Sequence, residues 1–483
     1  MQISVLRSLT ALVVLGAALP AAYLCAQAPT ITPTSPADRA AAIEIFKQLI
    51  EVNTTDTSLG NVTMGTAAMQ KRFLDAGFSE DDVHLLGPNP RKQNLVVRIK
   101  GTGAAKPVLF LCHMDVVEAL PKDWHTDPFK FIEKDGYYYG RGTQDMKESD
   151  AALVATFLWL HREGYKPQRD LILALTADEE GGSYNGANWL VQNHRELVDA
   201  AFVINPDAGG IDLEHGKPVE ADVEASEKVY SDFQVTAVNR GGHSSLPRPD
   251  NAIYELTAAL NKLAAYRFPF ELNGVTRAYT AEMAKLETGQ KAADLRAILA
   301  TPPDTGAVDR LSADAGWNSV LHTTCVATRL AGGHANNALP QSAEANINCR
   351  ILPGHPPEEI RQQLISLFAD PGLKVDIVLK GVVSSGVSGR PTSPPPPLNE
   401  VFVPMRTLVD QLWPGTPVVP EMETGASDSV FFTAADIPCY GFSAVALEHD
   451  DVRAHGQDER IPIDSYDKSV QFFYAYAKAL GNE

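Results

Sequence analysis

Short apolar runs that alternate with longer amphipathic stretches constrain the fold of this chain more than any other feature. The runs include NLVVRI at 94–99, PVLFLC at 107–112, DLILALTA at 170–177 and AFVIN at 201–205. Stretches with helical spacing lie between them, such as DAALVATFLWLHREG and GANWLVQNH. Strands that are apolar throughout need cover on both faces, and helices that connect parallel strands provide it. We therefore predict an α/β domain with a mostly parallel sheet and helices on both faces.

The pattern changes near residue 227, where KVYSDFQVTAVNR alternates like a half-exposed strand. A strand-helix-strand-strand-helix-strand order follows as far as KVDIVL, and it predicts an inserted α+β, ferredoxin-like domain. The proline-rich SGRPTSPPPPL then predicts a stiff connector. We expect the α/β domain at 38–226 and 390–483, and the inserted domain at 227–381 with extra material at about 268–315.

The first 28 residues predict a secretory signal peptide, with Arg7 before an apolar stretch and Ala26-Gln27-Ala28 as an Ala-x-Ala cleavage pattern. A membrane anchor is the alternative. The apolar stretch, which Pro20 interrupts, is shorter than the roughly 20 residues that a membrane span needs. We expect an exported protein, periplasmic or extracellular, without a membrane span once the signal is removed.

Charge and cysteine content exclude some classes of function. Asp and Glu number 60 against 41 Lys and Arg, a net charge of −19, whereas nucleic acid binding needs a basic face. No Cys-x-x-Cys pair occurs, so a thiolate metal site is not expected. Cys325 and Cys349 lie in two strand-like patterns that flank a turn-like AGGHANNALP. We predict neighbouring strands, with these cysteines either bridged or present as two free thiols.

Acidic side chains and a histidine follow several of the apolar runs. His113 and Asp115 follow VLFLC, Asp145 follows the glycine turn of GRGTQD, and Asp207 follows AFVIN. Taken singly, these residues have ordinary alternatives: a loop end, a helix cap and a Pro-Asp turn. Parallel strands end at one edge of their sheet. Together, the side chains therefore predict a cluster that can hold divalent metal ions.

Two adjacent acids, Glu179 and Glu180, end the strand in ALTADEEGG. Like charges this close repel and raise each other's pKa, so we expect positive charge beside them. One glutamate can bind a metal ion while its neighbour takes a proton from water. His455, in the loop RAHGQDERIPI, is either a further ligand or an ordinary surface histidine.

Taken in order, LCHMD, GRGTQDMK, DEEGG, NPDAGG and AHGQDE resemble the motifs of the co-catalytic zinc metallopeptidases. That family includes glutamate carboxypeptidase, aminoacylase and succinyl-diaminopimelate desuccinylase. The resemblance extends from AAIEIFKQLIEVNTT to the C-terminus and implies a zinc-exopeptidase-like fold with a lid. It implies two Zn²⁺ per chain, with Co²⁺ or Mn²⁺ as possible substitutes. The implied ligands are His113, Asp145, Glu180, Asp207 and His455.

The resemblance also implies individual roles. Asp145 would bridge the two ions and precede a cis peptide bond, with Glu179 as general base and Asp115 as the orienting partner of His113. In the lid, GGHSSLP implies that His243 polarises the scissile carbonyl, in many members across a dimer interface. The remaining motifs are NNALP, NCRILPG and ETGASDS. They point to Asn337, and to Arg350 and the backbone around Gly425 as the holders of a substrate carboxylate.

The predicted function is zinc-dependent hydrolysis of an amide bond that releases a C-terminal amino acid from a small peptide. The alternative is an N-acyl amino acid amidohydrolase, which uses the same chemistry with a different acyl pocket. A non-catalytic metal-binding protein is a third possibility, which the presence of Glu179 disfavours. A homodimer through the lid is the expected assembly, although the long stretch at 268–315 departs from compact family members.

Overall fold

The computed structural model of this protein describes residues 28–378, 397–423, 425 and 427–482. The predicted signal peptide, apart from Ala28, and most of the proline-rich connector lie outside these residues. Within the described ranges, no helix combines the length and the apolar character that crossing a membrane requires.

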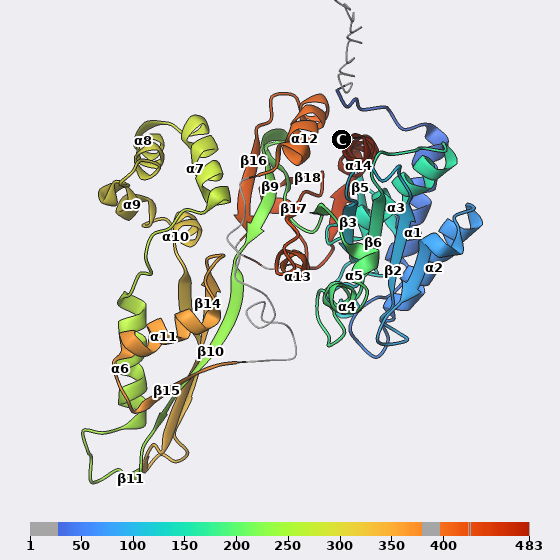
Figure 1. The fold of residues 1–483 in the computed structure, drawn as a ribbon. Helices are drawn as coiled ribbons and strands as arrows, with labels where there is room; N and C mark the ends of the chain where they lie inside the picture. Colours follow the sequence, from blue (N-terminus) through green and yellow to red (C-terminus); the bar gives the residue numbers. More distant parts are fainter. Residues whose placement is uncertain (1–27, 379–396, 424, 426, 483) are drawn as a thin grey trace, which may run out of the picture.

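A large mixed sheet forms the α/β part (Figure 1), with the order β1-β2-β6-β3-β7-β17-β9-β8-β18 and with β16 paired to β9. Its strands are β1 (Val83–Leu86), β2 (Asn94–Ile99), β3 (Val108–His113), β6 (Leu171–Thr176), β7 (Phe202–Asn205), β8 (Gly210–Glu214), β9 (Lys217–Glu227), β16 (Val418–Glu423), β17 (Cys439–Gly441) and β18 (Ala446–Glu448). The four central strands β6, β3, β7 and β17 are parallel. They include three of the four predicted apolar runs, so the largely parallel core is confirmed; the fourth run, NLVVRI, forms β2 and pairs antiparallel with β6.

Helices cover both faces of this sheet, as predicted. Alternate strand residues such as Phe110 and Leu109 enter different hydrophobic clusters, because successive side chains of a strand point to opposite faces. One face packs against α1 (Pro36–Ile50), α2 (Val62–Asp75), α3 (Lys147–Arg162), α12 (Asn399–Leu412) and α14 (Ile463–Gly481). The other packs against α4 (Gly186–Asn193), α5 (Arg195–Val198) and α13 (Ser429–Thr433).

The inserted domain is a four-stranded antiparallel sheet with the order β12-β14-β10-β15. Its strands are β10 (Val229–Val238), β12 (Thr324–Gly332), β14 (Ser342–Ile351) and β15 (Leu373–Ile377), and α6 (Ala252–Ala265) and α11 (Pro357–Phe368) pack on it. This order of strands and helices is the predicted ferredoxin-like one. Cys325 and Cys349 face each other in register, with Cα atoms 4.1 Å apart, and form a disulfide. The prediction of neighbouring strands is confirmed, and of its two alternatives the bridge is present.

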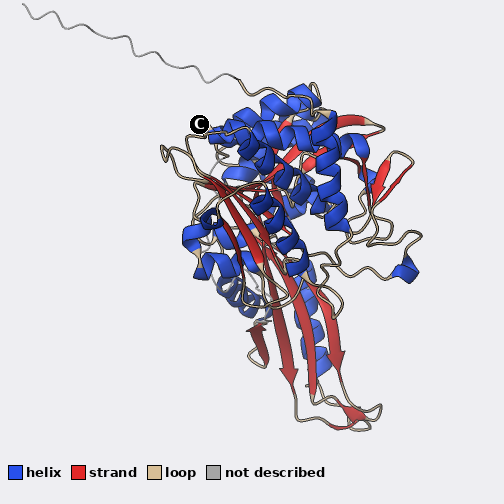
Figure 2. Ribbon diagram, turned by 90° about the vertical axis from the view of Figure 1, so that its right-hand side faces the viewer, coloured by secondary structure: helices blue, strands red, loops and turns tan. Residues whose placement is uncertain are grey.

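The extra material of the inserted domain is helical. It comprises α7 (Gly274–Leu286), α8 (Gly289–Ile298), α9 (Thr305–Leu311) and α10 (Ala315–Leu321), which enclose a small core of their own. In Figure 1 these helices lie beside β16 and above the rest of the inserted domain. The two-stranded β11 (Gly242–His243) and β13 (Ala338–Leu339) lie at the opposite, distal tip, which Figure 2 shows as the end of a long arm.

A third small sheet joins two loops that are remote in the sequence. It has the order β19-β5-β4, made of β4 (Ile132–Lys134), β5 (Tyr137–Tyr139) and β19 (Arg460–Pro462). Because β5 precedes GRGTQD and β19 follows AHGQDE, their pairing brings these two motifs side by side.

Candidate metal centre

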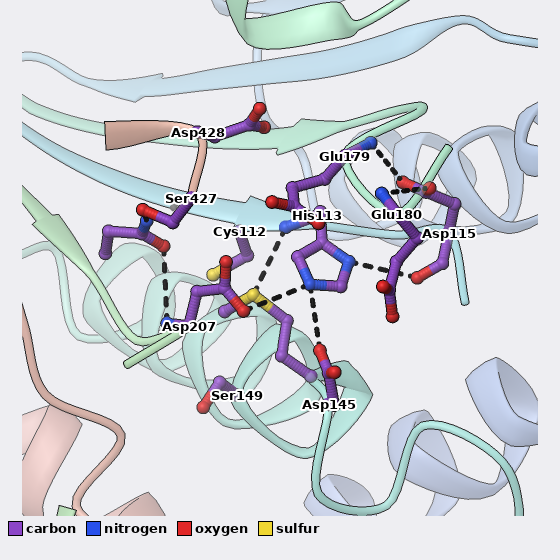
Figure 3. A network of polar contacts seen from close by, with 12 residues as sticks. Cys112, His113, Asp115, Asp145, Ser149, Glu179, Glu180, Asp207, Ser427 and Asp428 are labelled. Atoms are coloured by element: carbon purple, nitrogen blue, oxygen red, sulfur yellow. Dashed lines mark hydrogen bonds and ion pairs between the residues drawn. The ribbon is translucent and has the colours of Figure 1, made fainter. Parts of the chain in front are cut away.

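Three side chains converge at the carboxyl edge of the central parallel strands (Figure 3). His113 ends β3, and its Nε2 lies 3.0 Å from Asp145 Oδ1 and 3.2 Å from Asp207 Oδ1. Asp207 follows the neighbouring strand β7, and Asp145 precedes α3. The His113 ring is almost fully buried, at 2% exposure. One imidazole nitrogen and two carboxylate oxygens thus point at one small volume, which is the donor set of a divalent metal site.

A second group shares one residue with the first. His455 Nε2 lies 2.9 Å from Asp145 Oδ2 and 2.9 Å from Glu180 Oε2. The hydrogen bonds to the two carboxylates raise the pKa of His455 to about 10. The other Glu180 oxygen, Oε1, is buried without a hydrogen-bond partner among the described residues. Since each Asp145 oxygen faces a different histidine, the residues fit two divalent ions with Asp145 between them.

The turn that delivers Asp145 depends on glycine. Gly140 and Gly142 have φ angles of +149° and +91°, which favour glycine. The peptide bond between Asp145 and Met146 is cis, as the resemblance implied. The carboxylate of Glu459 accepts hydrogen bonds from the backbone N–H groups of Gly142 and Gln144 at 3.1 and 2.7 Å.

A buried ion pair that the sequence reasoning missed ties this turn to the His455 loop. Arg141 Nη1 lies 2.5 Å from Glu459 Oε2, and the two residues are 2% and 0% exposed. Both are charged residues inside recognised motifs, GRGTQD and AHGQDE, to which no role had been assigned. A buried charge needs a partner of opposite sign. Two unassigned charges of opposite sign in neighbouring motifs were therefore the signal that could have found the pair.

The contact made by Asp115 differs from the expected one. The Asp115 carboxylate accepts the backbone N–H groups of Glu179 and Glu180 at 3.1 and 3.0 Å, whereas His113 Nδ1 lies 3.0 Å from the Asp115 main-chain carbonyl (Figure 3). Asp115 thus contacts the His113 ring, as expected of its orienting partner, but through its main-chain carbonyl and not through its carboxylate. The side chain of Asp115 instead anchors the loop of the two adjacent glutamates.

A second anchor of the same loop is Lys92, which the sequence reasoning also missed. Its ammonium contacts the buried carboxylate of Asp178, and Tyr184 N donates to Asp178 Oδ2 at 3.1 Å. The next residue, Glu179, has its pKa raised well above the usual range by burial and by the charge of Asp207. A lysine directly before an apolar strand, in RKQNLVV, was the only sequence signal for this contact.

The remaining sequence-predicted residues lie on or near the inserted domain. His243 and Asn337 are exposed and adjacent at its distal tip, where Ser244 N donates to the Asn337 carbonyl at 3.1 Å. The structure therefore does not bring them to the metal groups of their own chain. Arg350 lies at the other end of the lid sheet, with its guanidinium 4.8 Å from the Tyr230 ring and no ion pair to a described residue. Gly425 N donates to Glu423 Oε1 at 2.8 Å.

Comparison with known proteins identifies the family. The family model described as peptidase family M20/M25/M40 matches residues 109–479, which is more than half of the chain. The chain belongs to this peptidase family. The matched range includes all five sequence-predicted metal ligands, so the candidate metal centre lies within the family region.

Curated relatives share sequence with this chain, and a solved structure shares its fold. The chain is 29% identical to a Xenopus tropicalis N-fatty-acyl-amino acid synthase/hydrolase PM20D1 over 76% of this chain and 71% of that protein. It is 28% identical to a Dictyostelium discoideum probable carboxypeptidase S-like 2, over 80% of this chain and 74% of that protein. An M20 family metallo-carboxypeptidase from Sulfolobus solfataricus has a similar fold, with a TM-score of 0.63 and 17% identity. The match covers 91% of this chain and 99% of that chain.

Proposed function

We propose that this protein is a dizinc exopeptidase that hydrolyses the last amide bond of small peptides and releases the C-terminal amino acid. The observation that carries the proposal is the position of Asp145, shared between two histidine-carboxylate groups with Glu179 in the adjacent loop. The family membership and the similarity to a probable carboxypeptidase support it.

Each residue of the site has a distinct proposed role. His113 and Asp207 would hold one zinc ion, Glu180 and His455 the second, and Asp145 would bind both. The ions would supply Lewis acidity that lowers the pKa of water and polarises the scissile carbonyl. Glu179 would take the proton of the attacking water and pass it to the leaving nitrogen. Asp115 and Lys92 would hold the Glu179 loop in place.

A second candidate function is hydrolysis of N-acyl amino acids, which the similarity to the synthase/hydrolase relatives favours. A panel of dipeptides, N-acetyl amino acids and N-dodecanoyl amino acids, with mass spectrometry of the products, separates the two candidates. We expect release of the C-terminal amino acid from dipeptides, with slower hydrolysis of both acyl series. Preferred cleavage of an acyl series would establish the second function, and no hydrolysis of any substrate would refute both.

We further propose export through the signal pattern at residues 1–28, and a homodimer through the inserted domain. Among the described residues, strand β12 is an edge of the lid sheet with no strand on its outer side, and it exposes Val326 and Leu330 at 60% and 67%. Exposed edges of this kind are suited to pairing with another chain. In such a dimer, His243 and Asn337 of one subunit would complete the site of the other, which would account for the place of β11, the strand of His243, at the distal tip in Figure 1.

Mixed dimers test this assignment. Single variants Glu179→Gln and His243→Ala are each expected to be nearly inactive. A heterodimer of one Glu179→Gln chain and one His243→Ala chain can be purified through two different affinity tags. If His243 acts across the interface, both defects fall in one site and the other site is intact. Since the two sites of a symmetric dimer are equivalent, the heterodimer should recover about half of the wild-type rate per dimer.

The matched control pairs Glu179→Gln with Asp145→Asn, two changes that disable both sites of the heterodimer, so no recovery is expected. If the Glu179→Gln and His243→Ala heterodimer also stays inactive, His243 does not act across an interface. A monomeric wild-type protein in light scattering would exclude the dimer altogether.

A further inference from the structure

A row of acidic side chains runs along two neighbouring strands beside the candidate metal centre. Within β9, residues two apart share a face, and the intervening Ala221 and Val223 belong to the main hydrophobic core. In β16, Glu421 is the register partner of Glu224; the register then shifts by one residue of β9, so that Glu423 is the partner of Glu227. We call this set the acidic strip: Glu220, Asp222, Glu224, Glu227, Glu421 and Glu423.

The acidic strip begins at the metal centre. Ser427 donates to Glu227 Oε2 through its backbone N–H at 2.8 Å and through its hydroxyl at 3.2 Å. Asn205 links Ser427 to the first metal group, because its Nδ2 lies 3.3 Å from Ser427 Oγ and its Oδ1 accepts the N–H of Asp207. Figure 3 shows Ser427 beside Asp207. From Glu227 the strip continues along β9 toward Glu220, away from the metal groups.

Three carboxylates of the strip have no cationic side chain paired with them in the described part of the chain, whereas Lys291 lies near enough to Glu220 for its charge to act on that carboxyl group. Among the described residues, no Lys or Arg forms an ion pair with Glu224, Glu227 or Glu421. Burial and neighbouring acids raise the pKa of Glu227 to about 8 and that of Glu421 to about 7. Carboxylates in such surroundings either take up protons or bind a cation.

Glu224 provides a second, independent observation. It is 4% exposed, and its Oε2 has no hydrogen-bond partner among the described residues. The charged groups that act on it are Glu227, Glu423, Asp207 and Glu421, so its carboxylate lies within the strip. A methyl group added to Gly441 would lie 3.0 Å from Oε2, so glycine at this position leaves room for the carboxylate. The Glu224 oxygen Oε2 packs against Gly441 and is buried among acids without a donor in the described part of the chain, and a bound cation would satisfy it.

The charge of the strip also fixes which part of a substrate can lie along it. The family resemblance implies that the substrate carboxylate lies at Arg350, and a carboxylate would be repelled by the strip. The strip therefore suits the acyl side of the scissile bond. From Glu220 to Glu227 the strip extends roughly 23 Å, at about 3.3 Å per residue. It therefore reaches well beyond the position of an α-amino group next to the scissile carbonyl.

Resting on the proposed function, we propose that the acidic strip binds an ammonium or guanidinium group on the acyl side of the substrate. The enzyme then prefers peptides whose penultimate side chain is lysine or arginine. In the helical insertion, α7 packs against β16, and the charges of Glu421, Glu220 and Asp222 act on its Tyr279, so α7 lies beside the strip. This gives a use to the extra helices, which the catalytic chemistry does not require.

Matched dipeptides test the preference in the wild-type protein. Lys-Ala and norleucine-Ala have side chains of similar length, and only the first carries a side-chain cation. We expect kcat/KM to be at least tenfold higher for Lys-Ala. Acetylation of the α-amino group in both dipeptides identifies the cation that is bound, because Lys-Ala then keeps only its side-chain ammonium. If the preference persists after acetylation, the side-chain ammonium is recognised; if only the free α-amino group matters, the side-chain assignment is overturned.

Variants of the strip locate the effect. Glu224→Gln and Glu421→Gln should each reduce the ratio of kcat/KM for Lys-Ala over norleucine-Ala severalfold, and the ratio is interpretable even if total activity changes. Glu51→Gln removes the same charge from an exposed site after α1 and should leave the ratio unchanged. Equal hydrolysis of both dipeptides would overturn the inference while the exopeptidase function stands. If neither dipeptide is hydrolysed, the exopeptidase function fails and the inference fails with it.

Discussion

The Glu179→Gln variant is expected to lose about 10²- to 10⁴-fold in kcat while it keeps two metal ions per chain. Glutamine has nearly the shape of glutamate but cannot accept a proton from water at neutral pH. The backbone N–H of residue 179 still reaches the Asp115 carboxylate, so the loop should keep its position. Metal content by plasma mass spectrometry and turnover on the best dipeptide measure both parts of the expectation.

The neighbouring Glu180→Gln variant is the matched control, because it makes the same chemical change one residue later. Glu180 belongs to the second metal group, so this variant should bind one of the two ions more weakly. Zinc titration of the metal-depleted variants would separate the two effects. Near-normal turnover in Glu179→Gln would assign the proton transfer to another group. Equal metal loss in both variants would mean that the two glutamates do not differ in role.

Replacing Arg350 with alanine is expected to lower kcat/KM on substrates with a free α-carboxylate. The loss of transition-state stabilisation should be about 2 to 5 kcal/mol. A guanidinium can hold a carboxylate through two parallel hydrogen bonds. Arg350 is half-buried against Tyr230 and has no ion-pair partner among the described residues. A surface ion pair, the ordinary use of such a residue, is therefore absent. The measurement compares a dipeptide with its C-terminal amide.

The wild-type protein should cleave the acid far faster than the amide, and Arg350→Ala should remove most of that difference. Arg277→Ala, a change of an exposed arginine on α7, serves as the control and should leave the difference intact. If the wild-type protein cleaves the amide as fast as the acid, carboxylate recognition is wrong. An aminopeptidase or a broader amidohydrolase would then be the better description.

Much of the site was predictable because its residues lie in short motifs at the ends of regular elements. The apolar runs predicted β2, β3, β6 and β7, since an apolar strand needs only local periodicity to be recognised. Parallel strands end at one edge, so the acids and the histidine that follow β3, β6 and β7 were expected to meet. His113, which ends β3, and Asp207, which follows β7, do so within about a hydrogen bond's length, and Asp145, which precedes α3, joins them.

By itself, therefore, the sequence determined the fold class, the candidate metal ligands and the position of Cys325 and Cys349 on neighbouring strands, whereas the disulfide between them was decided by the structure. Only the tertiary structure decided the contacts between residues that are far apart in the chain. These are the anchoring of Asp178 by Lys92, the pairing of Arg141 with Glu459, and the alignment of Glu224 with Glu421. It also decided that His243 lies at the distal tip, away from its own metal groups. The physical reason is that side-chain periodicity is a local property, whereas strand register and domain placement are set by packing of the whole chain.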